Sequence, residues 1–134
     1  MPSVLVDSNI LLDVFTKDKA WGKWSQGALR IAANNNRLII NAIVFAEVSV
    51  NFDRIEEADE ALTPLYEREA IPFDAAFLAG KVFSTYRRRG GPRPSLLPDF
   101  LIGAHAAVKG YGLLTRDVAR YRSYFPKLRL IAPD

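Results

Sequence analysis

Short apolar runs alternate along this chain with longer segments whose apolar residues recur at helical spacing. Val4–Val6, Leu38–Ile40 and Leu113–Thr115 are each bounded by polar residues, a pattern typical of strands buried on both faces of a parallel sheet. A fourth run, Leu128–Ile131, closes the chain. Ala70–Phe73 is predicted to be a short edge strand, because proline cannot donate a hydrogen bond to a neighbouring strand.

The segments between these runs are predicted to be helices. Ser8 and Asn9 can cap the first one, Asn41 the third and Asp74 the fifth. The predicted helices span residues 10–15, 21–32, 42–48, 55–69 with Pro64 as a kink or boundary, 74–89, 99–109 and a short stretch after 117. Strands that alternate with helices indicate βαβ units. We therefore expect one α/β domain over residues 1–134, with a central parallel sheet of about four to five strands between helices.

Composition narrows the class of protein. Of the 134 residues, 49% are hydrophobic and 25% are charged, which is ordinary for a globular domain. There is no apolar run long enough for a membrane span and no secretory signal pattern, so a cytoplasmic location is expected. The absence of cysteine excludes disulfides, thiolate metal sites and cysteine nucleophiles.

Charge is distributed unevenly along the chain. Residues 1–74 hold 7 basic and 12 acidic side chains, whereas residues 75–134 hold 11 basic and 3 acidic ones. The loop Gly90–Pro94 is flanked by arginines, and the basic candidates for contact with a polyanion are Arg87, Arg88, Arg89 and Arg93. Such a basic half favours a polyanionic partner, most often nucleic acid. The alternative is a solvated basic helix end.

Four acidic residues stand out by position. Asp7 ends the first strand, Glu47 lies within an apolar helix, Asp99 opens a helix, and Asp117 follows a buried strand. A glutamate in an apolar helical turn carries a desolvation cost unless its side chain reaches solvent or a partner. Each aspartate taken alone is also explained as a helix-start residue that favours the macrodipole.

Taken together, the four acids predict a metal site. Loops that follow parallel strands share one edge of the sheet, which brings Asp7 and Asp117 together, and the helix that begins at Asp99 can point there too. Two carboxylates about 4 Å apart repel by roughly 4 kcal/mol at an effective dielectric of about 20. Mg²⁺ or Mn²⁺, which prefer oxygen ligands, would relieve this repulsion and could assist phosphoryl transfer.

Other residues that could take part in catalysis or binding have weaker support from the sequence. His105, the only histidine, lies six residues after Asp99 and should not share its helix face, so a packed or surface histidine is expected. Gly90–Pro92 lacks the lysine and hydroxyl residue of a phosphate loop. Gly103 either permits a close approach or packs against another element. Tyr86 and the two tryptophans either stack on bases or pack in the core.

The sequence resembles the PIN domain family. The resemblance rests on Asp7-Ser8-Asn9 after an apolar strand, on Phe45-Ala46-Glu47-Val48, on Pro98-Asp99-Phe100-Leu101-Ile102 and on Leu113-Leu114-Thr115-Arg116-Asp117. It is closest to VapC-type toxins of toxin–antitoxin pairs, and it covers essentially the whole chain. The segment Tyr121–Pro126 is also similar to the one that follows the last acid in these toxins.

The resemblance implies a Mg²⁺- or Mn²⁺-dependent endoribonuclease with a PIN-like fold. Its acidic site would be Asp7, Glu47, Asp99 and Asp117. Asp7 and Asp99 would be the direct metal ligands, and Glu47 and Asp117 would bind a second metal, bind through water or orient the attacking water. The family positions that support this site fall on Asn9 and Thr115, and Arg116 is a candidate for phosphate contact or a surface residue. The resemblance also implies an RNA substrate, a cognate antitoxin and a homodimer.

Two other classes of protein compete with the nuclease. A non-catalytic α/β module would use the basic half to bind RNA and the acids only for structure. A phospho-acceptor receiver domain would require an adjacent acidic pair after the first strand, but Ser8 follows Asp7 here. Metal-dependent thermal stability separates the first two classes, because a metal that binds only the folded protein stabilises it.

Overall fold

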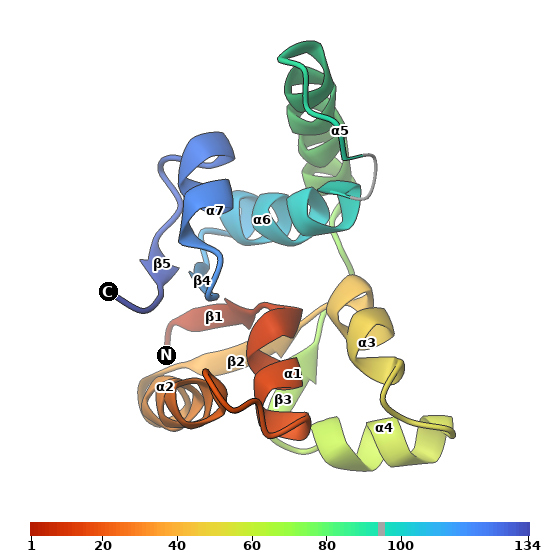
Figure 1. The fold of residues 1–134 in the computed structure, drawn as a ribbon, viewed down its shortest axis with the longest axis vertical. Helices are drawn as coiled ribbons and strands as arrows, with labels where there is room; N and C mark the ends of the chain where they lie inside the picture. Colours follow the sequence, from red (N-terminus) through yellow and green to blue (C-terminus); the bar gives the residue numbers. More distant parts are fainter. Residues whose placement is uncertain (94–95) are drawn as a thin grey trace.

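The centre of the molecule is a five-stranded parallel sheet (Figure 1). The computed structural model describes residues 1–93 and 96–134. The strands are ordered β3-β2-β1-β4-β5, and each neighbouring pair is parallel. Their bounds are β1 Ser3–Val6, β2 Arg37–Ile40, β3 Tyr66–Arg68, β4 Gly112–Leu114 and β5 Leu130–Ile131. The predicted α/β class and strand number are confirmed.

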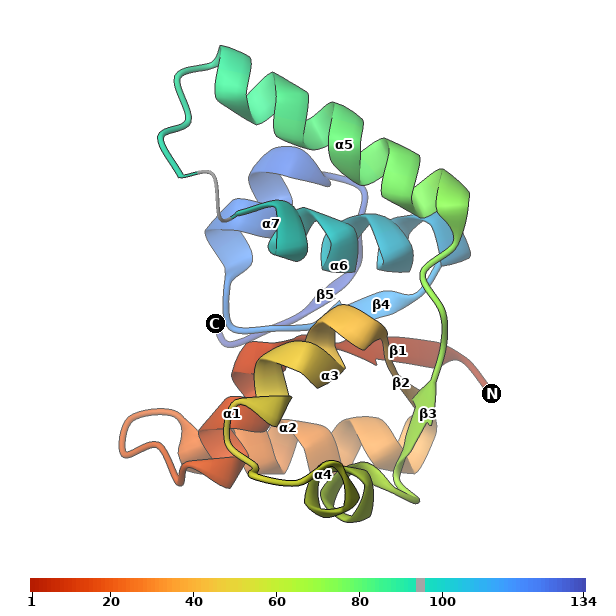
Figure 2. The same ribbon diagram turned by 90° about the vertical axis from the view of Figure 1, so that its right-hand side faces the viewer.

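Helices cover both faces of the sheet. They are α1 Ser8–Phe15, α2 Gly22–Asn35, α3 Ala42–Ser49, α4 Ile55–Leu62, α5 Phe73–Arg88, α6 Leu97–Lys109 and α7 Val118–Tyr124. Figure 2 shows α5 and α6 on one side of the sheet and α1, α2 and α4 on the other. No helix of residues 1–93 or 96–134 has both the length and the apolar character needed to cross a membrane.

The three central strands are buried on both faces. Residues 4–6, 38–40 and 113–114 are at most 2% exposed, which explains why each of them reads as a continuous apolar run. Phe100 and Ile102 of α6 are fully buried in the same core. The core therefore fixes the carboxyl ends of β1 and β4 beside the start of α6.

Two predicted helix ends are confirmed, and the predicted start of α1 is not. Asn41 Oδ1 accepts a hydrogen bond from Val44 N and caps α3, and Gly110 ends α6 with a φ of 70°, as predicted. The predicted capping of α1 by Ser8 or Asn9 is wrong, because Asp7 Oδ1 accepts from Ser8 N and is itself the cap. Asp7 is thus both the N-cap of α1 and one of the four predicted site acids.

The region between α4 and α5 differs from the prediction. Helix α4 ends at Leu62, just before Pro64, and residues 66–68 pair with β2 as the edge strand. The predictions of an edge strand at Ala70–Phe73 and of a helix cap at Asp74 are both wrong, because Pro72 is the N-cap of α5 and Asp74 lies in its first turn. Glu67 and Arg68 are exposed, so pairing with β2 rather than an apolar pattern defines this strand. Pro94, part of the predicted loop, lies outside the described residues.

Candidate active site

The four predicted acids converge on the carboxyl edge of the sheet. Asp7 follows β1 and Asp117 follows β4, two strands that are direct neighbours. Asp99 lies in the first turn of α6, and Glu47 lies in the last turn of α3. The charges of Glu47 and Asp117 both act on Asp99, and the charge of Asp99 acts on Asp7. The fold therefore joins acids from four separate segments into one site.

Asp7 is the most enclosed of these acids, being only 3% exposed. Its Oδ2 accepts hydrogen bonds from Thr115 Oγ1 at 2.8 Å, Tyr121 OH at 3.1 Å and Asn9 Nδ2 at 3.3 Å. Its Oδ1 accepts from Ser8 N at 2.8 Å. Each donor is neutral, and no ion pair of Asp7 occurs among the described residues. The carboxylate is thus oriented but not neutralised.

Electrostatics disfavour the charged form of two acids. Burial, reinforced by the charge of Asp99, raises the pKa of Asp7 from 3.8 to about 6, although its hydrogen bonds act in the opposite direction. Burial also raises the pKa of Asp99, with the charges of Glu47 and Asp117 adding to it, while Arg120 opposes the rise. Two acids that resist ionisation side by side would be stabilised by a bound cation.

Ser8 connects Glu47 to the strand end. Its hydroxyl donates to Glu47 Oε1 at 2.8 Å. Val44 and Val48 of the same helix are fully buried in the core, so α3 turns a different side towards the site. The apolar surroundings of Glu47 are therefore explained by one buried helix face, and its carboxylate is held by a partner that the sequence did not reveal.

Thr115 is the centre of the supporting hydrogen bonds. Its hydroxyl donates to Asp7 and accepts from Asn9 Nδ2 at 3.3 Å and from Asp117 N at 3.0 Å. Asn9 Oδ1 in turn accepts from Arg116 N at 3.3 Å. These bonds join α1 to the loop after β4, so both predicted supporting residues lie where they can fix the acids.

Two site residues escaped the sequence analysis, and both belong to α7. Arg120 Nη1 lies 2.6 Å from Asp99 Oδ2 and 2.7 Å from Asp117 Oδ2. Tyr121 is fully buried and donates its hydroxyl hydrogen to Asp7. Their spacing from Asp117 could have identified them. Arg120 and Tyr121 come three and four residues after Asp117 and so lie on the same side of a helix.

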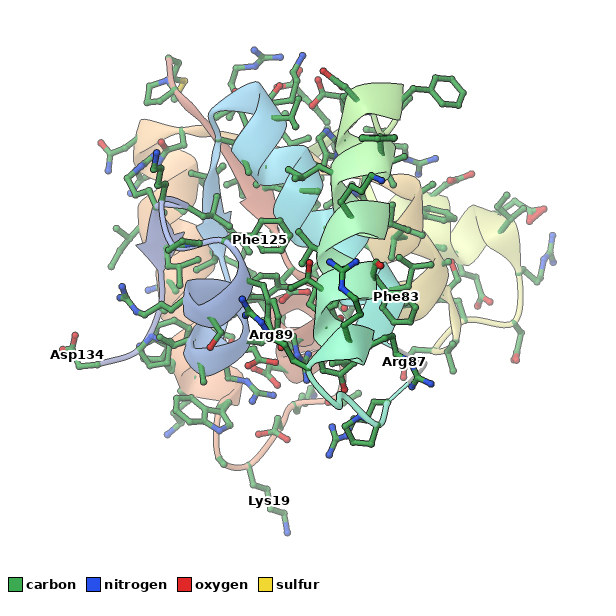
Figure 3. All side chains as sticks on the ribbon, turned by 90° about the horizontal axis from the view of Figure 1, so that it is seen from above. Lys19, Phe83, Arg87, Arg89, Phe125 and Asp134 are labelled. Carbon is green, nitrogen blue, oxygen red and sulfur yellow. The ribbon has the colours of Figure 1, made fainter. Side chains whose placement is uncertain are left out.

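The arginines predicted to contact RNA divide into two groups. Arg87, Arg88, Arg89 and Arg93 are exposed, and Figure 3 shows Arg87 and Arg89 near the end of α5 that leads towards α6. Arg116 is different, because its guanidinium forms two bonds of 2.6 and 2.7 Å to the buried carboxylate of Asp13. Arg116 therefore has a structural partner, whereas the side chains of the exposed group face solvent.

His105, Gly103 and Tyr86, for which other roles were considered from the sequence, lie in the core. His105 is fully buried between Asn41 Nδ2 at 3.0 Å and Glu69 Oε2 at 3.3 Å, and burial lowers its pKa. A side chain at Gly103 would collide with Phe125, so this glycine serves helix packing. Tyr86 is only 8% exposed and packs against aromatic neighbours.

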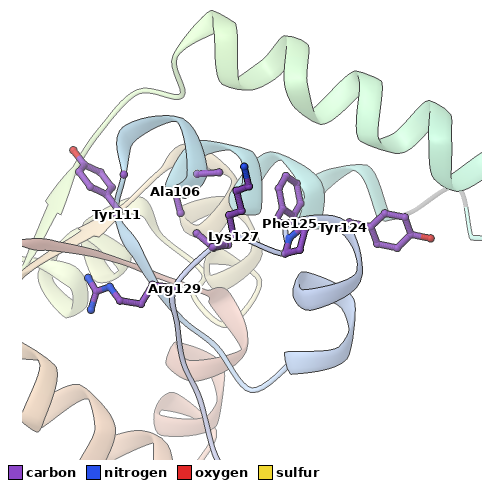
Figure 4. Close-up of a pocket in the computed structure, with 10 residues that line it drawn as sticks. Ala106, Tyr111, Tyr124, Phe125, Lys127 and Arg129 are labelled. Carbon is purple, nitrogen blue, oxygen red and sulfur yellow. The ribbon is translucent and has the colours of Figure 1, made fainter.

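A separate cavity of about 370 Å³ lies at the other end of α6 (Figure 4). Its walls include Ala106, Tyr111 and Phe125, with Lys127 and Arg129 adding positive charge. None of the four acids lines it.

Carboxylate oxygens are the donors that this site offers to a metal. Asp7, Glu47, Asp99 and Asp117 supply them, together with the side-chain oxygens of Asn9 and Thr115. Among the described residues, no three acids are gathered closely enough to hold an ion in the present arrangement. Arg120, bonded to two of the four, is the charge that lies between them.

Comparison with known proteins assigns the family. The PIN domain family matches residues 4–124, whereas no curated protein sequence matches the chain. One similar structure is VapBC2 of Rickettsia felis bound to promoter DNA, which shares 20% identity over 98% of this chain and 99% of its own, with a TM-score of 0.74. Another is a toxin–antitoxin complex of Klebsiella pneumoniae, which shares 22% identity over 98% of this chain and 98% of its own, with a TM-score of 0.71.

A third similar structure is VapC20 of Mycobacterium tuberculosis, a toxin that cleaves the sarcin–ricin loop. It shares 15% identity over 82% of this chain and 86% of its own, with a TM-score of 0.57. At these identities the structures share the fold, while the family match extends over nearly the whole sequence. On the match to residues 4–124 and the parallel sheet with its edge of four acids, this chain belongs to the PIN domain family.

Proposed function

We propose that this protein is the toxin of a VapBC-type toxin–antitoxin pair and that it cleaves RNA with the help of Mg²⁺ or Mn²⁺. The observation that carries the proposal is the environment of Asp7. This buried carboxylate has no cationic partner among the described residues and lies beside Asp99, a second acid of raised pKa. A purely structural aspartate in such a position would be expected to have a counter-charge. The neighbouring structures, several of them toxin–antitoxin complexes, support the biological setting.

The donor set fits a hard divalent cation. All the candidate ligands are oxygens. Burial first, and then the charge of Asp99, raise the pKa of Asp7, and a bound cation would favour the ionised carboxylate against both effects. Asp7 Oδ1 has one hydrogen-bond donor among the described residues, which leaves a lone pair for a ligand. A bound Mg²⁺ or Mn²⁺ would act as a Lewis acid on the phosphate and lower the pKa of a water molecule. Asp7 and Asp99 are the proposed ligands.

The other residues have distinct proposed roles. Glu47, held by Ser8, and Asp117, held through its backbone by Thr115, accept hydrogen bonds from the attacking water and orient it. Asn9, Thr115 and Tyr121 fix the carboxylate of Asp7 in one rotamer. Preorganised acceptors of this kind need no rearrangement as the reaction proceeds.

The exposed arginines at the end of α5 are the proposed RNA contacts. Arg87, Arg88, Arg89 and Arg93 lie on or beside the segment that leads into the helix of Asp99. Basic side chains next to an acidic centre would hold the phosphate backbone while leaving the scissile bond near the acids. Arg116 is less suited to this role, because its guanidinium is already paired with Asp13.

The proposed partners are a cognate antitoxin and a second copy of the chain. Phe73 and Phe77 on α5 are 94% and 67% exposed, an unusual position for two phenylalanines one helical turn apart. They provide an apolar surface for one of these contacts. Light scattering of the purified chain, with and without the Phe77→Ser change, tests the homodimer.

Cleavage of total cellular RNA by the antitoxin-free protein tests the activity. Wild type and Asp7→Asn are incubated with Mg²⁺, Mn²⁺ or EDTA, and the new ends are mapped by sequencing. Discrete cuts that require metal and disappear in Asp7→Asn are expected. A folded wild-type protein that binds RNA but makes no cut with either metal would contradict the nuclease and favour a non-catalytic RNA-binding module.

A further inference from the structure

One arginine nitrogen joins two of the proposed catalytic acids. Arg120 Nη1 lies 2.6 Å from Asp99 Oδ2 and 2.7 Å from Asp117 Oδ2. The three side chains are 24%, 21% and 31% exposed, respectively, so solvent reaches the contact. Arg120 therefore acts as a counter-ion within the acidic site.

A divalent cation bound by Asp7 and Asp99 would compete with the Arg120 guanidinium for Asp99 Oδ2. Each carboxylate oxygen bonded to Arg120 points a lone pair at nitrogen, and a metal ligand would have to point it at the ion. The repulsion between a doubly and a singly charged cation at contact distance is twice that of two single charges. Both cations cannot bind Asp99 Oδ2 together, so one must leave. A guanidinium that leaves Asp99 also leaves Asp117, because one nitrogen makes both contacts.

The side chain can move without the helix that carries it. Tyr121, the next residue, is fully buried and bonded to Asp7, which anchors α7. Arg120 in contrast is partly exposed and makes its contacts through the end of a long, flexible side chain. Arg116, which is locked to Asp13 by two bonds, lacks this freedom.

We infer that Arg120 is an exchangeable counter-ion, which a divalent metal displaces from Asp99 and Asp117 and which then binds a phosphate of the RNA. The inference rests on the proposed metal-dependent nuclease. Before the metal binds, Arg120 neutralises Asp99 and Asp117. After the metal binds, the guanidinium is free to contact the substrate. A guanidinium suits the second role, because its planar set of donors matches two phosphate oxygens.

The phosphate contact is tested by the salt dependence of KM for RNA cleavage in Mn²⁺. In Arg120→Ala, the slope of log KM against log salt concentration falls by roughly 0.7, the contribution of one phosphate on a single strand. Arg120→Lys retains most of the slope, because it keeps the charge. An unchanged slope in Arg120→Ala would contradict the phosphate contact.

The exchange itself is tested by calorimetric titration of the RNA-free protein with Mn²⁺. Arg120→Ala should bind Mn²⁺ roughly three- to tenfold more tightly than wild type, because two partly exposed ion pairs no longer have to be broken. Arg122→Ala is the matched control: it removes the same charge from an exposed position of α7, where no ion pair occurs within the described part of the chain. Its affinity should stay close to that of wild type. Circular dichroism confirms that each variant is folded.

The outcomes separate the two proposals. Tighter Mn²⁺ binding by Arg120→Ala alone supports exchange. Equal or weaker binding by Arg120→Ala, with clear binding by wild type, overturns exchange but leaves the metal-dependent nuclease intact. Failure of every folded variant to bind Mn²⁺ would overturn both.

Discussion

Two buried aspartates on one short segment have opposite surroundings. Asp7 and Asp13 are both 3% exposed, and they lie at the start and within α1. Asp13 accepts two bonds from the Arg116 guanidinium and one from Ser25 Oγ at 2.7 Å. Within the described part of the chain, the donors to Asp7 are all neutral, and its charged neighbour is another acid. Two equally buried aspartates therefore differ in their charge environment: Asp13 has a counter-charge, and Asp7 has none among residues 1–93 and 96–134.

Paired and unpaired buried carboxylates have different roles in a protein. A carboxylate whose charge is satisfied by the fold contributes to holding elements together, here α1, α2 and the loop after β4. A carboxylate that is oriented by hydrogen bonds but left without a counter-charge is destabilising by itself and ready for a ligand. Four predictions test this contrast, and they are ordered by the size of the expected effect.

Asp13→Asn should have the largest effect on stability. It breaks a buried ion pair and leaves Arg116 without its partner, which should lower the free energy of unfolding by about 3 kcal/mol. Urea denaturation followed by circular dichroism measures the loss. Asp53→Asn, at an exposed position, is the control and should change the free energy of unfolding by less than about 0.5 kcal/mol. If Asp13→Asn lowered the free energy of unfolding as little as the control does, the proposed difference between Asp13 and Asp7 would be contradicted.

Asp7→Asn should change stability in the opposite direction. Since the pKa of Asp7 is raised from 3.8 to about 6 in the folded protein, its ionisation costs about 3 kcal/mol of stability above pH 6. The amide removes this cost but can leave Ser8 N without an acceptor, so a net gain of about 1 to 2 kcal/mol is expected at pH 7.5.

The pH dependence provides an internal control for this gain. The unfolded aspartate ionises near 3.8 and the folded one near 6, so wild type loses stability as the pH rises from about 4 to 6. The gain in Asp7→Asn should therefore be complete above pH 6 and absent at pH 4. Thermal unfolding in EDTA across this range measures it. A pH-independent difference between the two proteins would refute the unpaired charge at Asp7.

Tyr121→Phe should have a smaller effect. It removes the hydroxyl that donates to Asp7 Oδ2 at 3.1 Å and should cost about 1 to 1.5 kcal/mol at pH 7.5. The cost should shrink below pH 6, where Asp7 is protonated. Tyr124→Phe on the same helix is the control, because the Tyr124 hydroxyl forms no side-chain bond within residues 1–93 and 96–134. Denaturation of both variants at pH 7.5 and 5 checks the expectation, and identical losses would contradict it.

Arginines with and without a carboxylate partner should also differ, and the change in RNA binding expected for the exposed arginines is the smallest of these effects. Changing Arg87, Arg88 and Arg89 to Ala should reduce the salt slope of RNA binding by roughly 0.7 for each lost phosphate contact, with stability unchanged. Arg116→Ala should instead lower stability, since it removes the partner of Asp13. Filter binding at several salt concentrations measures the first change. An unaltered slope in the triple variant would remove these arginines from the RNA surface.

Much of the architecture was determined by the sequence itself. Apolar runs buried on both faces identified β1, β2 and β4, because the inner strands of a parallel sheet have no polar side. Since parallel strands end at one edge, the positions of Asp7 and Asp117 after such runs were enough to place them together. Asn41 and Gly110 marked helix ends by local chemistry alone.

The pairing of charges depends on contacts between residues that are far apart in the sequence. Asp13 and Arg116 are 103 residues apart in the sequence, and Tyr121 and Asp7 are 114 apart. Local sequence patterns cannot predict contacts at such separations. The edge strand β3 was missed for the same reason, because its exposed residues become a strand through β2. The cost of a buried charge depends on which donors and cations are desolvated with it. The sequence therefore determined where the acids would lie, and the folded chain decided which of them would be left without a counter-charge.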